Sequence, residues 1–462
     1  MLQQVEYRLP AFRTWMYALA QKGQPVTSVM KRQNLVVTTK AKALLVLGYG
    51  VMTVWPVFTM WWAYAGETLI QSIGKALMGL LMMPLVVLGV YCIVLATAEL
   101  LYRPRAERLQ LAFCREYLQS YKGKVIVIAG SYGKTSMKEL LLATLGTEKK
   151  VAATIGNGNT PSAHAQFIRT LSGNEEFLLF ELGEGKPGDV RMFAEALRPE
   201  CAIITGLAPN HLDQYKSVDV LAKDLLSLNE FVSRDNLFIN GDSQQLLQFA
   251  PAQAMKYTSK GGQEWANREI QVSVQRTSFK FSDSSRTFEI SSPLLGRHQV
   301  GPLGFAAAFA LQLGVSAASV QKALSAFFPH QHRMQPYMLS GATIVDDTYN
   351  GNLEGILAGL SFLDEIKAKR TLYVTPGLVD QGEETDNVHI KIAEKISEVQ
   401  PDWVILMQNS ATDIIASQLS YLRYEGKVTF EPEPLQFYQN LDQIVRAGDV
   451  VLMQNDWTDN YH

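Results

Sequence analysis

The segment VIVIAGSYGKTSMKELL, residues 125–141, combines the three parts of a phosphate-binding loop. Four apolar residues that favour β structure lead into a loop with glycines at 130 and 133, and a helical pattern follows from Lys134. The full phosphate-loop pattern, G-x-x-x-x-G-K-[ST], requires a glycine at position 128, where this chain has Ile128. The sequence therefore predicts a strand, a shortened phosphate-binding loop and a helix, in that order.

The residue types in this loop suit the binding of a nucleotide. Glycines allow backbone N–H groups to approach an anion, and the ammonium of Lys134 supplies positive charge for the β- and γ-phosphates. The hydroxyl of Thr135 can bind Mg²⁺. The predicted nucleotide-binding residues are Gly130, Ser131, Tyr132, Gly133, Lys134, Thr135 and Ser136.

Bulk composition limits the classes of protein that fit. A chain of 462 residues is long enough for two or three domains, each with its own core. The formal net charge of −2 gives no indication of a nucleic-acid partner. The cysteines, Cys92, Cys114 and Cys201, are far apart and show neither metal-binding nor disulfide spacing. They are typical of a reducing compartment.

Two long apolar segments precede the phosphate loop. Residues 43–66 and 76–98 contain no charged side chain, and about 20 apolar residues suffice to cross the hydrocarbon core of a membrane. Tryptophans lie towards one end of the first segment, as interfacial aromatic residues do. We predict a transmembrane helical hairpin in contact with membrane lipid; the alternative is a buried helical hairpin in a soluble core.

The charges beside these segments predict their orientation. The connector 67–75 carries only Glu67 and Lys75, whereas basic residues cluster before the first segment and after the second. By the positive-inside rule both ends are cytoplasmic and the connector is external. The sequence thus predicts anchoring in the inner (cytoplasmic) membrane, with the catalytic domains in the cytoplasm. The flanking basic residues are Lys31, Arg32, Lys40, Lys42, Arg103, Arg105 and Arg108.

Strand-like and helix-like patterns alternate from residue 121 onward, which is typical of an α/β fold. Residues 268–292 alternate in the manner of antiparallel strands, and a new series of helices and strands begins near 301. We predict a membrane module over 1–120, a central domain over 121–292 and a C-terminal domain over 293–462.

Two further polar residues follow predicted strands of the central domain. Glu181, in FELGEGKPGDV (180–190), ends a buried strand, where a carboxylate can reach a metal ion beside the phosphate loop. His211 follows the next strand and is predicted to lie at the same edge of the sheet. Taken alone, His211 is better explained as a structural or surface histidine, but its position among strand ends that meet at the nucleotide favours a role in the site.

Several stretches, in the order in which they occur, resemble the Mur ligase superfamily. Its central domain is similar to GSYGKTSMKELL, TIGNGNTPSA (154–163), FELGEGKPGDV, LRPECAIITGLAPNHLDQYKS and INGD. Its C-terminal half is similar to LLGRHQVGPLGFAAAFALQLGVS (294–316), HRMQPY (332–337) and IVDDTYNGN (344–352). The motifs TIGNGN and DDTYNGN are most similar to the MurF group, which joins D-alanyl-D-alanine to UDP-N-acetylmuramoyl-tripeptide.

The resemblance implies a P-loop central domain followed by a Rossmann-like C-terminal domain, and an ATP-dependent amide ligase of cell-wall synthesis. ATP would phosphorylate a substrate carboxylate, and an amino group would attack the acyl phosphate. The implied partners are ATP, Mg²⁺, a muropeptide-like carboxylate acceptor, and an amino acid or dipeptide. Such a reaction requires neutralised phosphate charge and two substrates held in line, which agrees with the chemistry of the loop.

The resemblance also implies roles for individual residues. Thr135 and Glu181 would hold one Mg²⁺ and His211 would help to hold a second; Lys134, His211 and Arg333 would be catalytic. Gln299 would lie near the adenine, Arg333 near the phosphates and Asp347 near the ribose. Asn157 and Asn159 would lie near substrate and metal.

The chain departs from the MurF pattern in several places. Leu225 occupies the position of a lysine that the family modifies to a carbamate, and Lys223 is expected to point to another helix face. Asp380 replaces a usual glutamate. The hairpin occupies the position of the domain with which MurF binds the UDP-sugar. The sequence therefore leaves open whether the acceptor is a UDP-linked or a lipid-linked compound. Two alternatives stay open: a ligase for another amino-acid polymer, and a nucleotide-binding scaffold without activity.

Overall fold

The computed structural model describes residues 38–64, 68–209, 212–252, 254–349, 351–366, 368–378, 381 and 384–455. The chain divides into two compact units, Met1–Leu109 and Gln110–His462.

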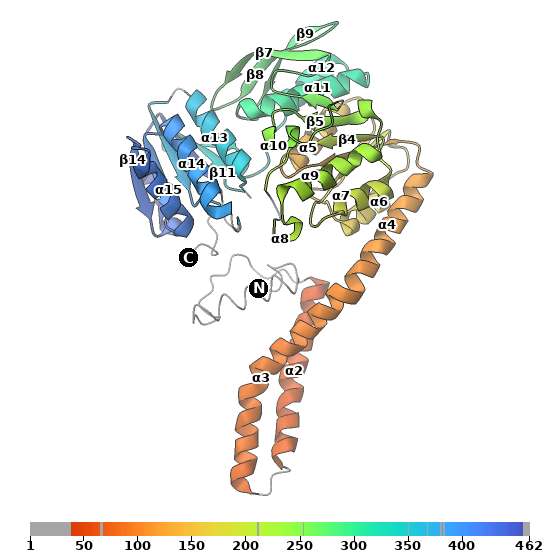
Figure 1. The fold of residues 1–462 in the computed structure, drawn as a ribbon, viewed down its shortest axis with the longest axis vertical. Helices are drawn as coiled ribbons and strands as arrows, with labels where there is room; N and C mark the ends of the chain where they lie inside the picture. The colour runs from red at the N-terminus through yellow and green to blue at the C-terminus, as the bar shows by residue number, and fades with distance from the viewer. Residues whose placement is uncertain are drawn as a thin grey trace. The chain divides into compact units, whose positions relative to one another are not determined.

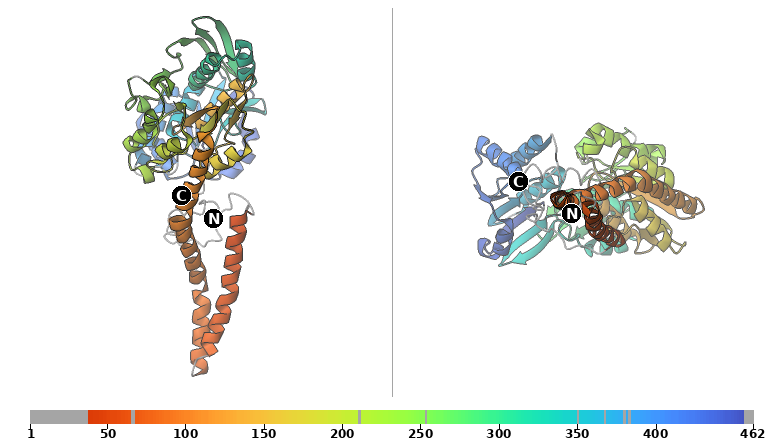
Figure 2. Two further views of the ribbon diagram at one scale, coloured as in Figure 1. Left: turned by 90° about the vertical axis from the view of Figure 1, so that its right-hand side faces the viewer. Right: turned by 90° about the horizontal axis from the view of Figure 1, so that it is seen from below.

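The first unit contains a helical hairpin made of α2 (Thr39–Tyr64) and α3 (Leu69–Thr97), which lie side by side (Figure 2). Two hydrogen bonds join the helices: the indole Nε1 of Trp55 donates to the Gly79 carbonyl at 2.7 Å, and the hydroxyl of Tyr91 donates to the Leu44 carbonyl at 2.9 Å. Gly79 also permits close packing, since a Cβ placed there would lie 2.2 Å from the Thr59 Cγ2 atom. The indole N–H of Trp55 and the hydroxyl of Tyr91 therefore bond within the hairpin.

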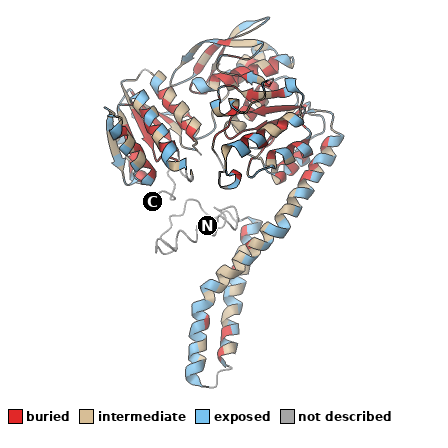
Figure 3. Cartoon of the chain, viewed as in Figure 1, coloured by how far each residue is buried: buried red, intermediate tan, exposed pale blue. Residues whose placement is uncertain are grey.

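Most of the large apolar side chains of the hairpin are exposed (Figure 3). Both α2 and the helix that begins at Leu69 are long and apolar enough to cross a membrane, as judged by length and composition. Little of either span is buried within the chain. In the part of the chain that the structure describes, the hairpin thus lacks the coverage expected of a helix pair inside a soluble core.

The second apolar helix is longer than the sequence analysis predicted. It begins at Leu69 instead of 76, because Thr68 and Gln71 form a capping box in which each side chain accepts a hydrogen bond from the other's backbone N–H. It does not end at residue 98 but continues through a π-helical turn, η2 (Ala98–Tyr102), into α4 (Arg103–Gln119). An ion pair between Arg103 and Glu99, one turn apart, spans that turn at 3.4 Å.

The second unit contains a parallel six-stranded sheet whose strand order is β2-β3-β1-β4-β5-β6. Two of its strands, β4 and β5, are labelled in Figure 1. Its central strands are buried, which fits their continuous apolar runs, since helices cover both faces of a parallel sheet. The strands are β1 (Lys124–Ala129), β2 (Val151–Ala153), β3 (Phe177–Glu181), β4 (Cys201–Ile204), β5 (Leu237–Asn240) and β6 (Met255–Tyr257). The associated helices are α5 (Lys134–Leu145), α6 (Pro161–Thr170), α7 (Asp189–Leu197), α8 (Leu212–Tyr215), α9 (Val218–Leu226), η3 (Ser227–Glu230), η4 (Arg234–Asn236) and α10 (Gln244–Leu247).

A second, antiparallel sheet follows, as the alternating pattern predicted. It consists of β7 (Trp265–Val272), β8 (Thr277–Asp283) and β9 (Thr287–Ser292). The next helices, η5 (Arg297–Gln299), α11 (Val300–Gln312) and α12 (Ala317–Ser325), lie beyond the boundary expected at 292/293. Their apolar residues nevertheless belong to the same core cluster as those of α5, with Phe305 and Phe309 against Phe238 of β5. By packing, the core of the central domain therefore extends through α12.

A third sheet, of order β10-β11-β15-β12-β13-β14, forms the C-terminal part. All neighbouring strands are parallel except β10 and β11. The strands are β10 (Gln335–Leu339), β11 (Ala342–Asp347), β12 (Arg370–Thr375), β13 (Trp403–Met407), β14 (Lys427–Glu431) and β15 (Asp449–Gln454). The helices are α13 (Leu353–Glu365), α14 (Thr385–Val399), α15 (Ser410–Tyr421), α16 (Pro434–Gln439) and α17 (Leu441–Ile444). The α/β fold class predicted from the sequence is confirmed.

Candidate active site

The glycine loop joins the carboxyl end of β1 to the first turn of α5, the geometry that suits phosphate binding. Segments that follow β4 hold the loop: the Ser131 amide donates to the Gly206 carbonyl at 2.9 Å, and the Ser131 hydroxyl donates to the Ala208 carbonyl at 3.1 Å. The hydroxyl of Thr205 bonds to the carbonyl oxygens of Ala129 and Tyr132. The neighbouring strand thus fixes the backbone of the loop.

Gly130 has a backbone conformation that other residues rarely adopt, with φ at 133°. A Cβ at this position would lie 2.5 Å from the Thr205 Oγ1 atom and 3.0 Å from the Gly206 nitrogen. We expect Gly130→Ala to displace the loop and to weaken ADP binding at least about tenfold, since backbone N–H groups bind the phosphates. Isothermal titration of the full chain with Mg·ADP measures this effect. Gly173→Ala, at an exposed left-handed glycine with open space around it, is the control; equal losses in both variants would contradict the assignment.

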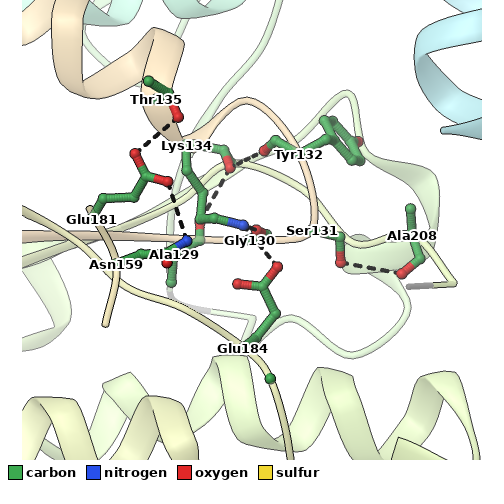
Figure 4. Close-up of polar contacts among 12 residues, drawn as sticks. Ala129, Gly130, Ser131, Tyr132, Lys134, Thr135, Asn159, Glu181, Glu184 and Ala208 are labelled. Atoms are coloured by element: carbon green, nitrogen blue, oxygen red, sulfur yellow. Dashed lines mark hydrogen bonds and ion pairs between the residues drawn. The ribbon is translucent and has the colours of Figure 1, made fainter. Parts of the chain in front are cut away.

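The side chain of Lys134 lies at the centre of the loop (Figure 4). Its Nζ atom donates to the Gly130 carbonyl at 2.5 Å and to the Oε1 atom of Glu184 at 2.7 Å. The two side chains are 12% and 4% exposed. Lys134 is therefore held within the loop by a carboxylate that the sequence analysis did not assign to the site.

Thr135, at the start of α5, and Glu181, at the end of β3, lie together, as their positions in the sequence predicted. The Thr135 hydroxyl donates to the Oε2 atom of Glu181 at 2.9 Å, and the amide of Asn159 lies 3.5 Å from Oε1 (Figure 4). Hydroxyl and carboxylate oxygens are the ligands that Mg²⁺ prefers, so these residues fit that cation. Among the described residues, no group of three or more His, Cys, Asp or Glu side chains is arranged to hold a metal.

Lys138 is a second buried lysine of the site that sequence reasoning missed. Its side chain is 0% exposed, and its Nζ atom lies 3.5 Å from Glu181 Oε2 and 3.5 Å from Glu139 Oε1. It also donates to the Gly156 carbonyl, in the loop that carries Asn159. A lysine one helical turn after Lys134 is on the same face of α5, and this spacing is the signal that could have revealed it.

The backbone of Glu181 is held as firmly as its side chain. Its N–H donates to the Thr154 hydroxyl at 3.2 Å, and His164 Nε2 lies 2.8 Å from its carbonyl oxygen. Burial lowers the pKa of His164 to about 4, so the ring is neutral at physiological pH and Nε2 carries the donated hydrogen. Thr154 and His164, from two other segments, therefore fix the backbone that carries the Glu181 carboxylate.

Other predicted residues of the central domain are not brought into this cluster by the described contacts. Asn157 is exposed, and His211 lies outside the described residues, as does Asp380 of the C-terminal domain. Leu225 is fully buried in the apolar core, whereas Lys223 is exposed on α9, as its expected rotation on the helix indicated. In the position of the family's modified lysine, this chain has a core residue.

The remaining predicted residues belong to the C-terminal half. The guanidinium of Arg333 lies over the ring of Tyr349, 4.9 Å from its centroid, and Gln299 bonds to the neighbouring His298 at 2.9 Å. Asp347 accepts hydrogen bonds from the Met334 amide at 3.1 Å and from Gln454 Nε2 at 2.9 Å. Burial raises the pKa of Asp347 to about 6, although the charge of Arg333 opposes the shift.

Comparison with known families agrees with the fold and the loop. Residues 128–310 match the Mur ligase middle domain, and residues 332–454 match the Mur ligase glutamate ligase domain. Together the two matches cover well over half of the chain.

Two curated relatives are UDP-N-acetylmuramoyl-tripeptide–D-alanyl-D-alanine ligases. The Bacillus subtilis protein is 24% identical over 343 residues, which is 74% of this chain and 74% of the relative. The Escherichia coli protein is 24% identical over 294 residues, which is 62% of this chain and 65% of the relative.

The solved structures indicate the same fold. MurF from Thermotoga maritima in complex with ADP superimposes with a TM-score of 0.66 at 20% sequence identity and covers 76% of this chain and 80% of that chain. MurF from Acinetobacter baumannii gives the same TM-score and identity, and covers 76% and 77%. The middle and C-terminal domain matches and the MurF relatives place this chain in the Mur ligase superfamily, whose members are ATP-dependent enzymes that form C–N bonds.

Proposed function

We propose that this protein is a membrane-anchored, ATP-dependent ligase of cell-wall synthesis that joins an amino acid or dipeptide to a muropeptide-like carboxylate. The arrangement of Lys134, Thr135 and Glu181 at the carboxyl edge of the central sheet carries this proposal. These groups suit the activation of a carboxylate by ATP, and the MurF relatives suggest the class of substrate.

The proposed reaction passes through an acyl phosphate. An acceptor carboxylate oxygen attacks the γ-phosphorus of ATP, and ADP leaves. The amino group of the second substrate then attacks the acyl carbon, phosphate leaves, and the nitrogen loses a proton. Lys134 stabilises the negative charge on the phosphates, and Thr135 and Glu181 would hold Mg²⁺, which supplies further charge neutralisation there.

Further roles come from the family resemblance. Arg333 would contact the phosphates, Asp347 the ribose and Gln299 the adenine. Asn157 and Asn159 would contact the substrate. His211 would help to hold a second cation, and Leu225, which is buried, replaces the lysine that the family modifies for this site.

The activity test is phosphate release by the full chain in detergent or nanodiscs. Release that requires both an acceptor carboxylate and an amino substrate is expected of a ligase. Release that is absent or independent of both would favour the second candidate, a nucleotide-binding scaffold, which the buried Leu225 motivates. Comparing UDP-linked with lipid-linked acceptors, for the chain with and without residues 1–120, tests whether the hairpin serves a membrane-linked substrate.

Membrane anchoring rests on the exposed apolar surface of α2 and α3. We expect the full chain to stay in the membrane fraction after an alkaline carbonate wash. A cysteine introduced by Ser72→Cys, near the short connector, is expected to react with a membrane-impermeant maleimide added outside intact cells. Asp219→Cys, at the start of α9, is the matched control and should react only after lysis. Extraction by carbonate would contradict the anchoring.

The raised pKa of Asp347 predicts a pH effect on ATP binding. Because burial disfavours the ionised form, the carboxylate is charged above about pH 6 and becomes protonated below it. A protonated carboxyl is a poorer acceptor for ribose hydroxyls, so the KM for ATP is expected to rise as the pH falls through 6. Steady-state kinetics from pH 5 to 8 measure this rise, and Asp347→Asn should flatten it. A wild-type KM that does not change with pH would count against the ribose contact.

A further inference from the structure

Glu184 is the carboxylate that pairs with Lys134, and it lies in the loop between β3 and α7. The residue is 5% exposed, and its Oε1 atom is 2.7 Å from Lys134 Nζ. Figure 4 shows its side chain pointing towards the glycine loop from the side opposite Thr135. Glu184 is therefore a buried partner of the phosphate-binding loop and not a counter-ion on the protein surface.

The second oxygen of Glu184 is incompletely satisfied. Oε2 is buried, and among the described residues it has no hydrogen-bond partner. A buried carboxylate oxygen without a donor is unfavourable, and in native proteins such atoms are partnered by protein, water or ion. The free oxygen lies beside the lysine at which phosphate groups are expected to bind. The carboxylate of Glu184 therefore presents negative charge at the place where the phosphates are expected to bind.

The charges around the loop are already balanced in the protein itself. Lys134 is paired with Glu184, and Lys138 is paired with Glu181. A free nucleotide would bring several negative charges to a lysine that already has a carboxylate partner, and it would meet repulsion from Glu184 at short range. A nucleotide accompanied by a divalent cation would bring its own compensation. The site should therefore bind the cation–nucleotide complex more tightly than the free nucleotide.

We propose that Glu184 makes nucleotide binding dependent on a divalent cation, so that the site selects the cation–nucleotide complex over the free polyphosphate. Glu184 acts by occupying Lys134 and by repelling uncompensated phosphate charge. This inference rests on the proposed function only in that the glycine loop binds a nucleoside di- or triphosphate; it does not depend on the ligase reaction.

The test is isothermal titration of the full-length chain in detergent with ADP, once in EDTA and once in MgCl₂. Wild type is expected to bind free ADP much more weakly than Mg·ADP. Glu184→Gln is expected to bind free ADP at least about tenfold more tightly than wild type, because a charge at contact distance is removed, and to lose most of the dependence on Mg²⁺. Glu184→Asp, which keeps the charge, should retain the dependence.

Glu195→Gln is the matched control, since Glu195 is exposed on α7 and pairs only with the exposed Arg191 in the described contacts. It should behave as wild type. If Glu184→Gln binds free ADP no more tightly than wild type, the role of Glu184 is overturned while the nucleotide site stands. A loss of Mg·ADP binding in Glu184→Gln would also overturn it and would make Glu184 a ligand of the cation. If wild type fails to bind Mg·ADP, the nucleotide site of the proposed function is overturned together with this inference.

Discussion

Replacing Lys134 by methionine is expected to lower kcat/KM for ATP by about three orders of magnitude or more, because the ammonium stabilises charge that moves between phosphates and acceptor during transfer. The geometry supports an effect of this size: Nζ is fixed by the Gly130 carbonyl and Glu184, so it is held in place before substrate binds. The ammonium of Lys134 is therefore already inside the loop when the substrates bind.

The measurement is coupled ADP release with both substrates at saturation. Lys150→Met, at an exposed lysine just before β2, removes the same charge and is expected to leave the rate unchanged. Lys134→Arg keeps the charge with a different shape and should recover only part of the loss. A Lys134→Met protein with near-normal kcat/KM would show that the loop does not take part in phosphate transfer.

Replacing Lys138 by methionine is expected to destabilise the protein by about 3–5 kcal/mol, the usual result of removing one partner of a buried ion pair. The side chain of Glu181 is 2% exposed, so the carboxylate would lose its cation without gaining water. The Gly156 carbonyl would lose its donor at the same time. Lys138 therefore contributes to the fold by pairing with a buried carboxylate and holding it in its orientation.

A double-mutant cycle separates this pairing from simple loss of packing. Glu181→Gln alone should also destabilise, and the double variant Lys138→Met/Glu181→Gln should be less destabilised than the sum of the two single variants. The free energy of unfolding is measured in urea, with Lys223→Met on the exposed face of α9 as the control. Strict additivity would mean that the pair contributes nothing beyond two separate side chains.

Much of the fold was predictable because its strands and helices have strong hydrophobic patterns. The strand β1 and the helix α5 occur where the pattern of residues 125–141 placed them, and β7 to β9 cover the stretch 268–292 that alternates in the manner of antiparallel strands. The strand β14, KVTFE, alternates polar and apolar residues, but it is short, lies at the edge of its sheet and is only partly buried, so its signal is weak. The helix α15 was missed although its capping box, Asn409 with Thr412, was visible in the sequence.

The candidate site was predictable to the extent that its residues end strands or start helices. Thr135 and Glu181 met these conditions, and their proximity follows from parallel strands in one sheet. Glu184 and Lys138 did not stand out, because charged residues in a loop and on a helix normally face solvent. Their importance comes from burial and pairing, which depend on segments far away in the chain. Leu225 shows the converse: the sequence places it where the family resemblance leads one to expect a lysine, and the structure buries it in the apolar core.

The packing of α11 and α12 on α5 has a consequence for how such proteins are assembled from modules during evolution. The apolar surface of α5, with Leu141 and Leu145, would be left in water if the central module were separated at 292/293. A fragment of the central module that keeps this surface covered includes α11 and α12 and runs through Ser325. An evolutionary exchange that cut the chain at 292/293 would therefore have to supply another cover for α5.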